Sequence, residues 1–110
     1  MKTQKTLERL VALRRQKAEQ AMALITAEIR REEAALAGVE AQVKALDAAA
    51  EDYASHSLAM RHGHPGHLQK QIEAHHRTLG AKRAQLEDAR LALKKAIHSE
   101  ERLQDLARGQ

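Results

Sequence analysis

Apolar residues in the second half of the chain recur alternately four and three positions apart. The twelve positions of this seam are Leu68, Ile72, His75, Leu79, Lys82, Leu86, Ala89, Leu93, Ala96, Glu100, Leu103 and Ala107. Nine of the twelve are apolar. This spacing keeps one stripe of a helix facing a neighbouring helix, as in a left-handed coiled coil. The pattern predicts a helix over about residues 66–107.

A looser seam of the same kind runs through the first half of the chain. Its members are Leu7, Val11, Arg14, Ala18, Ala21 and Ile25, then, after a slip of one residue, Ile29, Glu32, Leu36, Val39, Val43, Leu46, Ala50, Tyr53, Ser57 and Met60. We expect a helix over about residues 4–61, capped by Thr3 or Thr6. The slip after Ile25 would change the supercoil locally.

Three leucines, Leu10, Leu13 and Leu24, lie beside the first seam and widen its apolar stripe. A wide stripe indicates a helix that contacts more than one neighbour. The high helix propensity of leucine is an equally simple explanation. Both interpretations stay open at this stage.

The two seams flank the only proline of the chain, in the segment 61–67. Gly63 suits the position just after a helix, and Pro65 suits the first position of the next one. The sequence therefore predicts an all-α fold, a long antiparallel two-helix coiled-coil hairpin formed by residues 1–110 as one domain, with its turn at about 62–66. A looser connection, with the first helix ending near residues 55–57, is the alternative. Unequal helix lengths predict an N-terminal overhang of roughly 20 Å.

Three members of the second seam are polar, namely His75, Lys82 and Glu100. Polar seam residues specify the alignment of paired helices at some cost in stability. We expect Lys82 and Glu100 to fix the register, and His75 to be buried and neutral, facing a polar residue of the first helix.

Composition narrows the class of protein. Aromatic residues make up 1% of the chain and charged residues 31%, and there is no cysteine. A compact multilayer core is disfavoured because such cores depend on aromatic area, whereas long exposed helices have this composition. Disulfides are excluded, and a cytoplasmic location is favoured. No apolar run reaches the roughly 20 residues of a membrane span, and the N-terminus has no signal-peptide pattern.

Charge is distributed unevenly along the chain. Residues 1–17 carry six Lys/Arg against one acid, residues 18–60 three against eight, and residues 61–110 ten against six. We expect the basic, leucine-bearing N-terminal end to be the main partner-binding surface, because long-range attraction steers acidic partners. The residues predicted to bind are Lys5, Arg9, Leu10, Leu13, Arg14, Arg15 and Lys17.

The histidines of the turn are the strongest candidates for chemistry. His62, His64 and His67 could ligate a metal ion. Their spacing matches no closed zinc site, so we expect a solvated turn with no metal and no cofactor. No nucleophile–base grouping or phosphate-binding loop is present, and we expect no enzymatic activity. Nucleic-acid binding is disfavoured because the chain lacks aromatic stacking platforms and DNA-binding motifs.

The order of features resembles the central-stalk family of type III secretion, which includes the flagellar protein FliJ and its virulence-system counterpart YscO. These features are a basic start with Leu7, Leu10 and Leu13, a long Ala/Glu/Gln/Arg-rich helix with Tyr53 near its end, a polar turn, and a return helix with heptads from Ile72 to Leu103.

The resemblance implies a non-enzymatic stalk that binds a hexameric export ATPase, an export gate protein and secretion chaperones. It implies a cytoplasmic location, peripheral to the inner membrane at a secretion apparatus. A self-associating coiled coil, such as a dimeric four-helix bundle, and a basic coiled coil that associates with nucleic acid remain the alternatives.

Overall fold

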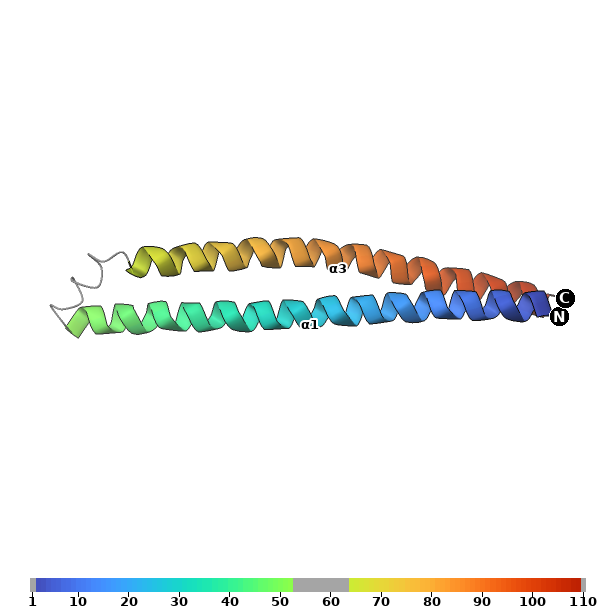
Figure 1. Ribbon diagram of the computed structural model, residues 1–110, viewed down its shortest axis with the longest axis horizontal. Helices are drawn as coiled ribbons and strands as arrows, with labels where there is room; N and C mark the ends of the chain where they lie inside the picture. The colour runs from blue at the N-terminus through green and yellow to red at the C-terminus, as the bar shows by residue number, and fades with distance from the viewer. Residues whose placement is uncertain (1, 53–63, 110) are drawn as a thin grey trace. The chain divides into compact units, whose positions relative to one another are not determined.

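The computed structural model describes residues 2–52 and 64–109. Two helices account for them, α1 at Lys2–Asp52 and α3 at His64–Arg108. The fold is an all-α antiparallel two-helix hairpin, which confirms the predicted class (Figure 1). The predicted helical residues 53–61 and the start of the predicted turn, residues 62–63, lie outside the described residues.

One local hydrogen bond is seen near the start of α1 and another at the end of α3. The hydroxyl of Thr6 donates a hydrogen bond to the Lys2 carbonyl inside the helix, at 2.8 Å. The expectation that Thr3 or Thr6 caps α1 is therefore wrong, because α1 already begins at Lys2. At the other end, the Gly109 N–H donates to the Asp105 carbonyl at 3.0 Å, directly after α3 ends at Arg108.

The chain divides into two compact units, and each pairs a segment of α1 with a segment of α3. The terminal unit contains Met1–Ala27 and Arg83–Gln110, and the middle unit contains Glu28–Lys82. Within each unit the two helical segments lie side by side and run in opposite directions (Figure 1). Both chain ends belong to the terminal unit.

The middle unit holds most of the buried apolar residues. Ile29 and Leu36 of α1 are 8% exposed, and Leu68 and Leu79 of α3 are 2% exposed. Between the helices, the ammonium group of Lys82 pairs with the Glu28 carboxylate.

A second polar pair crosses the middle unit, between His75 Nδ1 and the Glu32 carboxylate. The side chains of His75 and Glu32 are 25% and 21% exposed. The prediction that His75 faces a polar residue of the first helix is confirmed, although the ring is half-buried rather than buried.

In the terminal unit, α1 presents a different set of residues to α3 from the predicted one. The half-buried residues include Val11, Arg15, Ala18, Met22 and Ile25. Leu7, Arg14 and Ala21, which we placed in the seam, are exposed. Arg15 replaces Arg14 because its guanidinium reaches Glu100 of α3 at 2.7 Å, and Met22 buries more apolar area than Ala21 would.

This correction also removes the predicted slip after Ile25. With Arg15 and Met22 in place, α1 alternates spacings of four and three from Val11 to Leu46. All twelve predicted seam positions of α3 are buried or half-buried. The seam of α3 is therefore confirmed, whereas the seam of α1 is confirmed only from Ile25 to Leu46, together with Val11 and Ala18.

The expected N-terminal overhang is not seen in the terminal unit. Arg15 pairs with Glu100, eight residues before the end of α3. The eight residues after Glu100 consequently run beside the residues before Arg15, and no extension of roughly 20 Å of α1 beyond α3 is seen (Figure 1). The basic N-terminal segment is thus part of a helix pair and not a free extension.

The helix interiors contain two glycines, Gly38 and Gly80. A Cβ atom added at either position would meet no atom within 4 Å. Neither glycine is therefore needed for a close approach of the helices, and each weakens its helix by up to about 1 kcal/mol relative to alanine.

Leu79→Asp should destabilise the protein by about 3 kcal/mol or more, because a carboxylate would be buried without a partner. Leu79 is only 2% exposed. Leu91→Asp is the matched control, since Leu91 is 56% exposed on the same helix. Thermal melts followed by circular dichroism measure both. Similar melting temperatures for the two variants would show that Leu79 does not lie in the seam.

The Lys82–Glu28 pair should set the register through charge. Lys82→Glu opposes two carboxylates across the seam and should lower the free energy of unfolding by about 1 kcal/mol. The exchanged double variant, Lys82→Glu with Glu28→Lys, should recover most of this loss. Urea unfolding at low and high salt provides the measurement. A double variant no more stable than the single one would rule out a direct charge interaction.

Candidate functional site

The exposed large apolar side chains are concentrated in the terminal unit. Among the described residues, all seven of them lie there: Leu7, Leu10, Leu13, Leu24, Leu91, Ile97 and Leu106, with exposures from 38% to 66%. Of the five buried apolar residues in the described part of the chain, by contrast, only Ala96 belongs to this unit. Exposed apolar patches on a soluble domain mark interaction sites. The terminal unit is therefore the candidate site.

The terminal unit is also the basic part of the molecule. Its sequence contains twelve Lys/Arg against seven Asp/Glu, a net charge of +5, whereas the middle unit contains seven against eight. Apolar and cationic side chains thus occur together on the outer sides of both helices of this unit, around one hollow on α1 and another on α3. Such a surface attracts an acidic partner over a distance and then offers it apolar contact.

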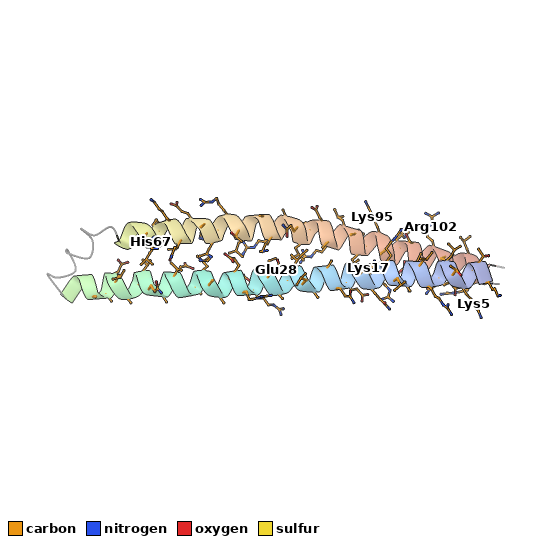
Figure 2. The ribbon with its side chains drawn as sticks, viewed as in Figure 1. Lys5, Lys17, Glu28, His67, Lys95 and Arg102 are labelled. Carbon is orange, nitrogen blue, oxygen red and sulfur yellow. The ribbon has the colours of Figure 1, made fainter. Side chains whose placement is uncertain are left out.

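Six of the seven residues predicted to bind a partner are exposed. Leu10 and Leu13 are 56% and 52% exposed, and the cations Lys5, Arg9, Arg14 and Lys17 are exposed as well. The structure brings four of these residues together in a shallow hollow of α1, lined by Leu7, Leu10, Val11, Leu13, Arg14 and Lys17. The Lys5 side chain points away from α3 (Figure 2).

Arg15 does not belong with the other predicted binding residues. Its Nε donates to Glu100 and a terminal nitrogen donates to Glu19, both at 2.7 Å. The hydrogen bonds to Glu100 and Glu19 raise the pKa of Arg15, so its charge is kept. Arg15 aligns the helices instead of facing a partner protein.

Helix α3 contributes a second exposed group that the sequence analysis did not identify. Leu91 and Ile97 line a hollow together with Lys94, Lys95, His98 and Glu101. The Lys95 side chain points away from α1 (Figure 2). The sequence did contain a sign of this group. Leu91 and Ile97 lie outside the seam of α3, and positions outside the seam of a charged helix are normally polar.

No group of three or more metal-ligating side chains occurs among the described residues. Of the three turn histidines, His62 lies outside the described residues. His67 is exposed and exchanges a hydrogen bond with Gln71 at 3.2 Å. Neither of the two described helices is long and apolar enough to cross a membrane.

Removing metal ions should leave the melting temperature unchanged. The described parts of the two helices are held together by apolar burial and by ion pairs between their own side chains. We expect the same melting temperature with and without chelator, and after replacing His62, His64 and His67 by Ser. Circular dichroism melts measure this. A large loss of helicity on chelation would show a structural metal ion bound to the turn histidines.

The chain was compared with known protein families, curated proteins and solved structures, and none of them matches it.

Proposed function

We propose that this protein is a non-enzymatic coiled-coil stalk of a type III protein export apparatus. In this role the protein binds the hexameric export ATPase and couples that ATPase to the export gate and the secretion chaperones. The order of sequence features supports this function, since it resembles the central-stalk family. One structural observation carries the docking part of the proposal: the terminal unit exposes all seven large apolar side chains of the described residues on a basic surface.

A stalk needs one part that holds itself together and another that binds. The middle unit supplies the first, because Ile29, Leu36, Leu68 and Leu79 bury their side chains against each other's helices. The terminal unit supplies the second, because Leu10, Leu13 and Leu91 stay more than half exposed. Burying one such leucine against a partner contributes roughly 1.5–3 kcal/mol.

Self-association is the second candidate function, and the same exposed leucines favour it. A two-helix hairpin has little core of its own, and small domains of this kind commonly gain stability by oligomerising. Sedimentation of the purified protein separates the candidates. A stable dimer that binds no export ATPase would support the self-associating coiled coil.

Binding to the export ATPase should depend on the cations of α1. Lys5→Glu with Arg9→Glu should weaken binding about tenfold or more and reduce its salt dependence, because both residues are exposed at the basic end. Affinity measurements with the purified hexameric ATPase from the same organism provide the test.

The matched control is Lys70→Glu with Arg77→Glu, an equal charge change at exposed positions of the middle unit. The control variant should keep its affinity. If the wild-type protein binds no export ATPase, the proposed function is wrong. Equal losses in both variants would instead show that net charge matters and that the terminal unit is not the docking end.

A further inference from the structure

Helix α1 carries a second seam in the terminal unit, on a face that α3 does not cover. We name it the outer stripe. Its members are spaced alternately four and three residues apart and are all exposed: Thr3, Leu7, Leu10, Arg14, Lys17, Ala21 and Leu24. Spacing of this kind is what one coiled-coil helix presents to another. The inner seam of α1 is already filled by α3, so the outer stripe is suited to a further helix.

Two cations occupy the middle of the outer stripe, with leucines towards both ends. No acidic residue lies three or four positions from Arg14 or Lys17, so neither has a partner along its own helix. None of the ion pairs in the described part of the chain includes either residue. The middle of the stripe therefore presents two uncompensated positive charges.

These charges oppose pairing of the stripe with a second copy of itself. In an antiparallel arrangement, Leu7 would lie opposite Leu24 of the other copy, and Arg14 would lie opposite its Lys17. Four cations would then meet at the centre of a matched apolar seam. A parallel arrangement also places each cation opposite its own equivalent. Like charges across an interface cost several kcal/mol and exclude wrong partners.

The position of the cations also argues against a membrane surface. An in-plane membrane helix keeps its cations on the polar face and inserts large apolar side chains opposite them. In the outer stripe, Arg14 and Lys17 instead interrupt the row of leucines. A coiled-coil partner with acids at the facing positions satisfies both kinds of residue at once.

We propose that the outer stripe binds an acidic amphipathic helix of a partner protein, which packs on α1 as a third strand. The partner helix carries apolar residues at 3–4 spacing towards both ends and two acidic residues in the middle, facing Arg14 and Lys17. This inference names the partner chemistry of the docking end and rests on that part of the proposed function.

The test uses a charge-reversed copy of the full chain as the acidic helix. The variant Arg14→Glu with Lys17→Glu keeps the leucines of the outer stripe but presents two acids in the middle. Mixed with wild-type protein, it should form a heterodimer, because each cation now faces an acid. We expect the dissociation constant of this heterodimer to be about tenfold or more below that of either homodimer. Sedimentation equilibrium of each protein and of the equimolar mixture measures this. High salt should weaken the heterodimer.

Two control variants locate the interaction. Leu10→Ser with Leu24→Ser in the wild-type partner should abolish the heterodimer without changing the melting curve, since both leucines are more than half exposed. Lys70→Glu with Arg77→Glu in place of the reversed stripe should form no heterodimer, since this charge change lies in the middle unit. Association of that control with wild-type protein would show unspecific charge attraction and would overturn the proposal.

Two other results would also overturn it. One is a mixture that associates no better than its components. The other is a wild-type homodimer lost on replacing Leu10 and Leu24, which would make a second copy the occupant.

Binding to vesicles containing anionic lipid, dependent on the same leucines and without heterodimer formation, would assign the stripe to membranes. None of these experiments contains the export ATPase. A failed ATPase measurement therefore bears on the proposed function, and a failed mixing experiment bears on the outer stripe.

Discussion

The single seam between α1 and α3 is the constraint on which every other property of this protein depends. In residues 2–52 and 64–109 a side chain faces either the one neighbouring helix or the solvent, because these residues form two helices and no third layer. Polar residues inside the seam or directly beside it must therefore find partners across it, as Glu32, Arg15 and Glu28 do with His75, Glu100 and Lys82. These side chains keep 21% to 30% of their exposure, so pairing them costs less desolvation than full burial would.

Two charged pairs, Lys82–Glu28 and Arg15–Glu100, favour the antiparallel alignment because they place the acid on opposite helices. In the middle unit, α1 supplies the acids and α3 supplies Lys82 and His75. In the terminal unit, α1 supplies the cation and α3 supplies Glu100. Shifting the helices by one heptad would separate Arg15 from Glu100 and Lys82 from Glu28, which disfavours the wrong register.

The two units use their apolar residues differently. The middle unit places Ile29, Leu36, Leu68 and Leu79 in the seam and buries them. The terminal unit has several alanines in its seam, among them Ala18, Ala89, Ala96 and Ala107, and places its exposed leucines outside. Alanine buries little apolar area. The terminal unit therefore buries less apolar surface between its two helices and leaves more of it exposed. This exposed apolar surface is the physical basis of the proposed docking role.

The sequence by itself determined the helical hairpin, the complete seam of α3 and the basic, leucine-bearing character of the N-terminal end. These follow from periodicity and charge, which are local properties. It did not determine which face of α1 meets α3 near the N-terminus, because Leu7, Val11 and Leu10 are all apolar and Arg14 and Arg15 are adjacent. Only the tertiary structure decided this, since Glu100 of α3 pairs with Arg15 and thereby turns Leu7, Leu10 and Arg14 outwards. The face of α1 that meets α3 is thus set by a contact between residues 85 positions apart in the chain. The pattern of residues within α1 cannot predict such a contact.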